Sequence, residues 1–175
     1  ALYDQWWPDP EPAFAHATDI QLGHPDHPKV TMTAHDWLNT GPPWHQGMIR
    51  GAKGGEKPKF SGHWAIKVLE EGIYKVSLLR WPEEANHPIN ATLPPGSNVP
   101  GASKAFRTTR GVSIKATAAA LLLNGQEIAR KPVGKKDIAI SFTTKLIKGS
   151  HAIAPIFRSP KGETGAFYCI IEKQP

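Results

Sequence analysis

Two tryptophans and two histidines lie close together in the segment 35–46, HDWLNTGPPWHQ, around a Gly-Pro-Pro turn. Indole rings can pack on the apolar faces of sugar rings, while imidazole, amide and guanidinium groups can donate to hydroxyl or sulfate oxygens. The fixed φ of the two prolines would hold the rings in place before a ligand arrives. Arg80 and Trp81, which end a later strand, would complete this surface if the fold brings them near. We therefore predict a ligand-binding surface of aromatic and polar side chains: His35, Trp37, Trp44, His45, Gln46, Arg50, Arg80 and Trp81.

The same tryptophans have an alternative role in packing. A buried indole can fill a core or an interdomain contact equally well when its N–H finds an acceptor. For Trp37 and Trp44 both roles stay open. Trp64 and Tyr74 continue alternating strand patterns, so we expect them in the core.

Patterns for catalysis or metal binding are sparse. His24-Pro25-Asp26-His27 offers metal-ligand types, but its prolines and the lack of a supporting helix disfavour a tetrahedral site. No Gly-x-Ser-x-Gly turn, phosphate loop or Asp-x-Asp-x-Asp loop occurs, and Glu70-Glu71 and Glu83-Glu84 are adjacent rather than facing carboxylates. We therefore expect no catalytic residue, metal or cofactor in this chain. The main alternative is a self-contained hydrolase that uses the His, Asp and Trp residues of 35–46.

The charge of the chain is uneven along its length. Its formal net charge is +6, yet residues 1–50 carry 2 basic and 6 acidic side chains, whereas residues 51–175 carry 19 and 9. A basic surface attracts polyanions such as sulfated glycans, anionic lipids or nucleic acid. A polyanion- or nucleic-acid-binding module is a second alternative. We do not expect nucleic acid, since neither a ribonucleoprotein motif nor a recognition helix accompanies the charge.

Short alternating runs predict an all-β fold. The 17 prolines and 16 glycines indicate many turns, and Asn124-Gly125 between apolar runs is a strong hairpin signal. A helical turn competes with the strand at 116–122. Regularly spaced strands with turn residues between them are typical of a β-sandwich. The expected strands are 29–34, 63–69, 74–81, 111–114, 118–123, 126–129, 137–146, 151–157 and 166–172.

The N-terminal segment has a different composition. Tyr3 to Trp7 suggests the end of a helix, which Pro8, Pro10 and Pro12 then stop. We expect residues 1–22 to be a short helix and linker and residues 23–175 to be the β-sandwich module. No window reaches the roughly 18 apolar residues of a membrane helix, and we expect any targeting signal to have been removed or to lie upstream. The single cysteine, Cys169, lies in an apolar run and is expected to be a buried small hydrophobe.

Four strings carry a resemblance to a known family: YDQWW with the following Glu11-Pro12, TAHDWLNTGPPWHQGMIR, GHWAIKVLEEGIYKVSLLRWPEEANHPI and the late GAFYCIIE. Together they resemble the carboxy-terminal region of bacterial arylsulfatase-type sulfatases over nearly the whole chain. The resemblance implies a sulfatase domain upstream as the partner, with a divalent cation such as calcium in that domain. It also implies a periplasmic or secreted protein with no membrane partner.

The family's formylglycine motif, Cys/Ser-x-Pro/Ala-x-Arg, is not credible in this chain. Cys169-Ile-Ile-Glu-Lys does not fit it. Ser103-Lys-Ala-Phe-Arg107 fits by letter, but the residues that follow depart from the family pattern and no acidic cluster accompanies them. The resemblance therefore implies that this chain is not an enzyme by itself.

A second resemblance concerns architecture. The order of strands and turns is similar to that of galactose-binding-like carbohydrate modules, which are jelly-roll β-sandwiches. The strings that carry this resemblance are GHWAIKVLEEGIYKVSLL, ALLLNGQEI and DIAISFTTKLIKGSHAI. The leading hypothesis is thus a non-catalytic C-terminal accessory domain of a sulfatase. Such a domain either packs on the catalytic domain or binds the sulfated carbohydrate substrate.

Overall fold

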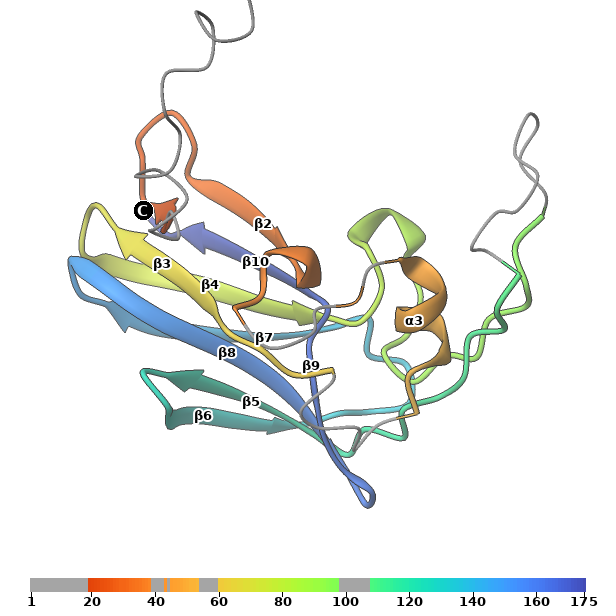
Figure 1. Cartoon of the computed structure of the whole chain (residues 1–175). Coiled ribbons are helices and arrows are strands. Elements are labelled where there is room, and N and C mark those ends of the chain that lie inside the picture. Colours follow the sequence, from red (N-terminus) through yellow and green to blue (C-terminus); the bar gives the residue numbers. More distant parts are fainter. Residues whose placement is uncertain (1–18, 39–42, 44, 54–59, 98–107) are drawn as a thin grey trace, which may run out of the picture.

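Two β-sheets face each other in the computed structural model, which describes residues 19–38, 43, 45–53, 60–97 and 108–175 (Figure 1). One sheet has the strand order β1-β3-β8-β5-β6, with β9 also paired to β8, and the other has the order β2-β10-β4-β7. The predicted all-β sandwich is confirmed. The strands are β1 Ile20–Leu22, β2 Lys29–Thr33, β3 Trp64–Val68, β4 Gly72–Leu79, β5 Ala118–Leu123, β6 Gln126–Pro132, β7 Ala139–Leu146, β8 Gly149–Ser159, β9 Gly162–Gly165 and β10 Tyr168–Lys173.

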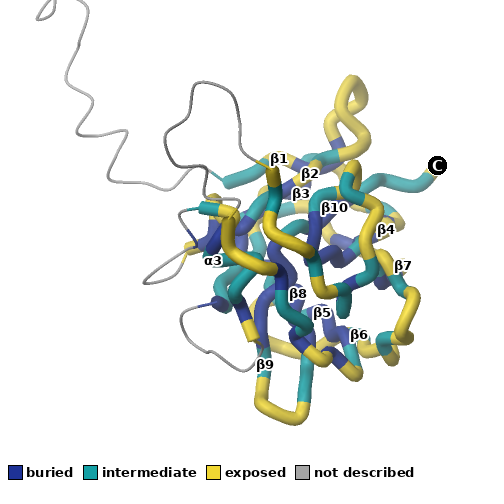
Figure 2. The backbone as a smooth tube through the Cα atoms, turned by 90° about the vertical axis from the view of Figure 1, so that its right-hand side faces the viewer, coloured by how far each residue is buried: buried dark blue, intermediate teal, exposed yellow. Residues whose placement is uncertain are grey.

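The core lies between the two sheets, where buried residues of the strands gather (Figure 2). Successive side chains of a strand point to opposite faces of its sheet, so one face can be buried. Trp64 and Tyr74 are fully buried, as predicted. The Trp64 indole N–H donates to the Thr33 carbonyl at 2.8 Å, and the Tyr74 hydroxyl donates to the Glu70 carbonyl at 2.5 Å. Each large apolar side chain buried in this way stabilises the fold by roughly 1.5–3 kcal/mol.

The predicted hairpin at Asn124-Gly125 is also present. Both residues have positive φ, 51° and 80°, as a type I′ turn requires, and they join β5 to β6 in antiparallel pairing. The competing helical turn at 116–122 does not form, because Ala118 to Leu123 pair with β8 on their other side.

Several boundaries differ from the prediction. Ile20–Leu22 pairs in parallel with Ile66–Val68, so the sandwich begins before residue 23. The sequence did not signal β1, because three residues are too few for an alternating pattern to be recognised. The strand expected at 111–114 is reduced to one bridge, between Gly111 and Leu93. The N-terminal helix expected at residues 3–7 lies outside the described residues.

Two short elements were not predicted. The helix α3 (Gln46–Gly51) contains two glycines, which disfavour helix in a sequence pattern. The strand β9 is four residues long with glycine at each end. No helix of the described part is long and apolar enough to cross a membrane.

One end of the sandwich gathers α3, the 3-10 turn η2 (Glu83–Ala85) and three long loops (Figure 1). We call this the loop end: residues 45–53, 80–97, 108–117 and 133–138. Backbone hydrogen bonds hold its segments together, from Val112 N–H to the Arg50 carbonyl at 3.0 Å and from Ile89 N–H to the Asp137 carbonyl at 2.8 Å. The opposite end of the same strands carries the tight turns at 23–28 and 70–71.

Candidate ligand-binding site

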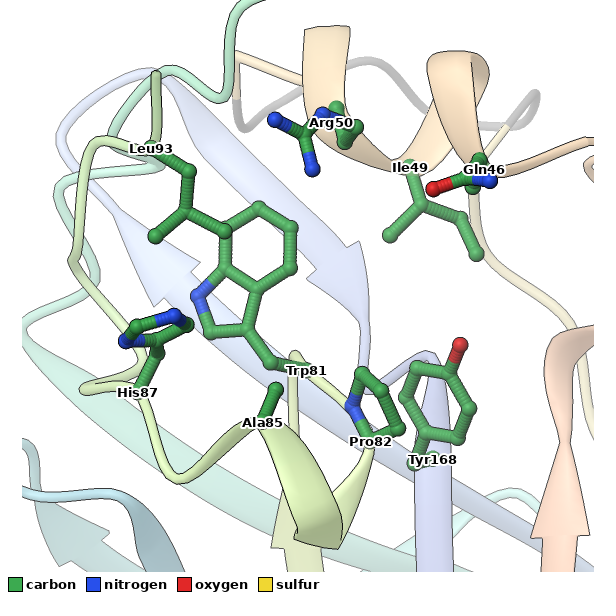
Figure 3. Close-up of a pocket in the computed structure, with 9 residues that line it drawn as sticks. All are labelled: Gln46, Ile49, Arg50, Trp81, Pro82, Ala85, His87, Leu93 and Tyr168. Atoms are coloured by element: carbon green, nitrogen blue, oxygen red, sulfur yellow. The ribbon is translucent and has the colours of Figure 1, made fainter. Parts of the chain in front are cut away.

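A pocket of about 240 Å³ lies at the loop end (Figure 3). Its walls come from α3, the end of β4, η2, the loop that follows η2, and the first residue of β10. The lining is mostly apolar with a few polar groups, as in most small-molecule sites. The lining residues are Gln46, Ile49, Arg50, Trp81, Pro82, Ala85, His87, Leu93 and Tyr168.

Trp81 forms the central wall of this pocket, and its ring is held on two sides. The indole N–H donates to the Pro88 carbonyl at 3.0 Å. The guanidinium carbon of Arg80 lies 4.3 Å from the ring centroid, which is a cation–π distance. Figure 3 shows the indole between Leu93 and Pro82. The ring therefore has a fixed orientation before any ligand arrives.

Tyr168 stands beside Trp81 because of the strand register. Tyr168 pairs with Leu79, two residues before Trp81, and it faces outward because the next residue, Cys169, is buried. Burial raises the pKa of the Tyr168 hydroxyl, and the negative charge of Glu84 raises it further. The hydroxyl is therefore protonated at neutral pH. It makes no hydrogen bond to the described residues, so it is available as a donor.

The ring of Tyr168 also lines two further hollows, so the three adjoin one another. One has a volume of about 220 Å³ and includes His35, His45 and Gln46. The other, of about 200 Å³, extends over the outer face of β2 and β10 toward Glu83 and Glu84. The pocket therefore continues along the surface in two directions.

Arg50 ties the pocket wall to neighbouring loops. Its Nε donates to the Thr109 carbonyl at 2.7 Å, and its Nη2 donates to the Pro94 carbonyl. Gln46 and His87 are exposed, and neither side chain forms a hydrogen bond within the described part of the chain. These two side chains and the Tyr168 hydroxyl are polar groups of the pocket lining that form no hydrogen bond within the described part of the chain, and the Arg50 guanidinium lines the same pocket.

Arg80 is not a surface residue, which corrects its predicted place in the ligand-binding surface. It has no exposed area, and its Nη2 donates to the carbonyls of Ile49 and Ala52 at 3.4 and 3.2 Å, at the C-terminal end of α3. Burial lowers the pKa of Arg80 to about 9. Its Nε and Nη1 have no hydrogen-bond partner among the described residues. Arg80 therefore supports both α3 and Trp81 from beneath.

Trp37 is a core residue, which settles its two open roles in favour of packing. It is 3% exposed, and its ring centroid lies 5.6 Å from those of Trp64 and Phe167. Gly62 and Gly165 lie against it, so close that an added Cβ would be 2.7 and 2.6 Å from Trp37 atoms. Trp37 is therefore removed from the candidate site.

The predicted surface is thus divided by the structure. Gln46, Arg50 and Trp81 line the pocket, and His35 and His45 line the adjoining hollow. Trp37 and Arg80 are buried, and Trp44 lies outside the described residues. The residues that sequence reasoning missed are Ile49, Pro82, Ala85, His87, Leu93 and Tyr168.

Tyr168 alone among the missed residues had a usable signal. The alternation of its strand places Tyr168 and Ile170 on the face opposite to Cys169 and Ile171. The pairing of β10 with β4, which brings Tyr168 to Trp81, joins residues far apart in the sequence and left no local signal.

The described residues of the other metal-ligand and nucleophile candidates are not part of the pocket lining. His24 and His27 belong to a turn at the opposite end, with ring centroids 5.8 Å apart, beside a hollow of about 370 Å³. Within the residues that the structure describes, no three His, Cys, Asp or Glu side chains group as metal ligands. Cys169 is fully buried, and burial raises the pKa of its thiol. The motif Ser103–Arg107 lies outside the described residues.

No protein-family model matches the chain, and no curated protein matches it in sequence. Among solved structures, the chain is similar to a ruminal GH26 endo-β-1,4-mannanase, with 15% identity, a TM-score of 0.43, and coverage of 83% of this chain and 26% of the mannanase. It is also similar to a family 35 carbohydrate-binding module from an environmental isolate, with 10% identity and a TM-score of 0.36. This match covers 65% of this chain and 69% of the module. The chain is also similar to a Podospora anserina GH26-CBM35 β-(1,4)-mannanase, with 13% identity and a TM-score of 0.38. This match covers 84% of this chain and 28% of the mannanase. The chain thus spans little more than a quarter of either mannanase.

Proposed function

We propose that this chain is a non-catalytic carbohydrate-binding module whose glycan occupies the pocket between Trp81 and Tyr168. One observation carries the proposal: an aromatic ring fixed on two sides borders a pocket with unused polar groups at its edge. A ring that is already oriented loses little conformational freedom when the ligand binds, so less of the interaction free energy is lost to ordering.

The pocket suits a sugar because it offers both kinds of contact that a sugar needs. The apolar C–H face of the sugar ring would pack on Trp81, Ile49 and Leu93. Sugar hydroxyls would accept from the Tyr168 hydroxyl and pair with the Gln46 amide. The two adjoining hollows give neighbouring sugars a place on either side, so the ligand would be an oligosaccharide rather than a single sugar.

The partner in this proposal is the catalytic domain of a sulfatase, and the glycan is a sulfated polysaccharide. Support for the sulfatase comes from the strings around TAHDWLNTGPPWHQGMIR and GHWAIKVLEEGIYKVSLLRW. Support for an anionic glycan comes from the excess of basic residues after residue 50. The reaction, its divalent cation such as calcium, and a periplasmic or secreted location would then belong to the whole enzyme.

Isothermal titration calorimetry with a panel of neutral and sulfated oligosaccharides tests the proposal. The wild-type chain should bind at least one oligosaccharide saturably, and Trp81→Ala should lower the affinity by about tenfold or more, since ring contacts of this kind contribute on the order of 1–3 kcal/mol. The control Ile147→Ala removes a 56% exposed side chain at the opposite end and should leave the affinity unchanged. Absence of binding to the whole panel would refute the proposal. Hydrolysis of an aryl sulfate by this chain alone would contradict its non-catalytic part.

A further inference from the structure

In the described part of the loop end, four exposed cations lie on loops that contact one another. Arg110 and Lys115 lie in the loop 108–117, and Lys135 and Lys136 lie in the turn between β6 and β7. Within the described residues, none of the four side chains forms an ion pair or a hydrogen bond. We call these four residues the basic rim.

Elsewhere on the described part of the sandwich, several cations are paired with a carboxylate. Five such pairs have N–O distances of 2.6–3.5 Å: Lys29–Glu83, Arg130–Glu127, Lys145–Glu71, Arg158–Glu163 and Lys173–Glu70. Among the described residues, four other exposed lysines also form no ion pair or hydrogen bond, but they lie on separate strands and turns: Lys67, Lys75, Lys148 and Lys161. The basic rim differs from these because its members belong to loops that are bonded together.

Hydrogen bonds place the basic rim beside the pocket. The Asn90 side chain exchanges two hydrogen bonds with the backbone of Ala116, at 2.8 and 2.7 Å, which fixes the neighbouring Lys115. Ile89 N–H donates to the Asp137 carbonyl at 2.8 Å, which fixes the turn that carries Lys136. Ile89 and Asn90 belong to the same loop that supplies His87 and Leu93 to the pocket wall.

Arg110 extends the rim along the other side of this loop. The next residue, Gly111, forms a pair of 2.9 Å backbone hydrogen bonds with Leu93, a pocket residue. The preceding residue, Thr109, accepts a hydrogen bond from Arg50, which also lines the pocket. The rim therefore follows the pocket wall on the side away from Glu83 and Glu84.

The charges around the pocket are consequently asymmetric. Glu84 lies on the η2 side, next to the hollow that continues over β2 and β10, together with Glu83, whose carboxylate is paired with Lys29 at 3.0 Å. On the rim side the nearest carboxylate in the sequence, Asp137, accepts the Gly134 N–H at 2.7 Å. An anionic group that leaves the pocket toward the rim is attracted, whereas one that leaves toward η2 is repelled.

We propose that the basic rim is a second subsite, which takes the anionic substituents of a glycan whose neighbouring sugar occupies the pocket. This inference rests on the proposed function. The shared chemistry of its ligands is an oxyanion, sulfate or carboxylate, attached to a sugar. Arginine and lysine donate to such groups, and exposed charges act through attractions that salt screens over a Debye length of about 8 Å. The rim would thus select glycans by charge and the pocket would select them by shape.

The test compares two full-length variants with the same change in net charge. The rim variant carries Arg110→Gln, Lys115→Gln, Lys135→Gln and Lys136→Gln. The control variant carries Lys67→Gln, Lys75→Gln, Lys148→Gln and Lys161→Gln. Titration calorimetry at low and at physiological salt uses carrageenan oligosaccharides, the same oligosaccharides after chemical desulfation, and oligogalacturonate.

The rim variant should lose about tenfold in affinity for a charged oligosaccharide, as four exposed interactions of a few tenths of a kcal/mol each predict. The desulfated oligosaccharide should bind the rim variant and wild type equally, and the control variant should match wild type throughout. Added salt should weaken charged ligands only. The stronger wild-type binder among carrageenan and oligogalacturonate identifies the anion.

Three results would overturn the inference. The rim variant could bind charged oligosaccharides as wild type does, or the control variant could lose as much affinity as the rim variant. A single-stranded DNA oligonucleotide could bind as tightly as carrageenan and depend on the rim but not on Trp81, which would make the rim a nucleic-acid site. If the desulfated glycan binds through Trp81 while the rim has no effect, only this inference fails. If no glycan binds at all, the proposed function fails with it.

Discussion

Trp37 and Trp81 have nearly the same exposure, 3% and 4%, but their surroundings differ in every other respect. Trp37 is enclosed by Trp64, Phe167 and two glycines, and within the described residues its indole N–H has no hydrogen-bond partner. Trp81 has its N–H bonded to the Pro88 carbonyl and borders a pocket of about 240 Å³.

The exposed fraction of a tryptophan side chain therefore does not tell whether its ring only fills the core or also borders a pocket. The deciding feature is whether the ring borders unfilled space while the protein satisfies its polar atom. By this criterion Trp37 stabilises the sandwich, and we propose that the fixed ring of Trp81 binds the ligand.

Trp37→Ala should have the largest effect on stability. Removal of a buried tryptophan leaves a cavity between rings that cannot collapse, and such changes cost about 3–5 kcal/mol. Unfolding in urea measures the loss, with the smaller truncation Trp37→Phe as the graded control. A loss below about 1 kcal/mol would mean that Trp37 is not a core residue.

Gly165→Ala should destabilise the same region from the other side. The added Cβ would lie 2.6 Å from the Trp37 ring, and overpacking of this kind costs about 1–3 kcal/mol. Gly51→Ala is the matched control, since its Cβ would meet nothing closer than 3.6 Å. Thermal unfolding should show a clear loss for Gly165→Ala and none for Gly51→Ala. Equal stability of the two variants would contradict the packing described for Trp37.

Trp81→Phe and Trp37→Phe together separate the two regions. Trp81→Phe should lower glycan affinity about tenfold because stacking area is lost, and it should cost about 1 kcal/mol of stability because the hydrogen bond to Pro88 is lost. Trp37→Phe should lower stability and leave affinity intact. Parallel calorimetry and denaturation measure both quantities. If both variants lose affinity for the glycan, Trp37 and Trp81 do not have separate roles in stability and binding.

Tyr168→Phe should weaken binding more mildly. The hydroxyl has no partner in the described residues, so its removal should cost the protein no stability, and the lost hydrogen bond to the glycan is worth about 0.5–1.5 kcal/mol. Burial and Glu84 raise the Tyr168 pKa, so the donor is present at every pH below that raised value. Affinity should therefore stay constant from neutral pH to about pH 10, the ordinary range of tyrosine, and fall only beyond it. If Tyr168→Phe binds as tightly as wild type and shows the same fall in affinity above about pH 10, Tyr168 is not the donor.

Glu127→Gln changes a surface ion-pair cluster that should affect neither the packing of Trp37 nor the binding of glycan at Trp81. Hydrogen bonds from Arg130 and Arg158 lower the Glu127 pKa to about 2, so its stabilising effect is complete above the unfolded-state value of about 4.5 and is lost as the pH falls through 2. The variant should be slightly less stable than wild type at pH 7 and equal to it near pH 2. Its glycan affinity should match that of wild type. A constant difference in unfolding midpoint between pH 7 and pH 2 would contradict the ion-pair assignment.

The β-sandwich could be predicted from the sequence, because alternating apolar residues and turn residues are patterns within short segments. Trp64, Ile66 and Val68, and the Asn124-Gly125 turn, have the predicted roles. The strand β1 was missed because it is short and pairs with β3 across more than 40 residues.

Only some residues of the candidate site could be predicted from the sequence. The sequence pointed to Gln46, Arg50 and Trp81, whose residue types carry the chemistry. It could not place Tyr168 beside them, because the register of β10 on β4 decides this. It also could not tell that Arg80 is buried, because the end of a strand does not fix which way the chain turns into the next loop.

The most direct test of the account follows the indole N–H signals of the six tryptophans by NMR while a bound oligosaccharide is added. The signal of Trp81, assigned from its absence in Trp81→Phe, should shift saturably because its ring borders the sugar. The signal of Trp37 should stay in place because its ring is enclosed in the core. A saturable shift of Trp37 with no change at Trp81 would contradict the account.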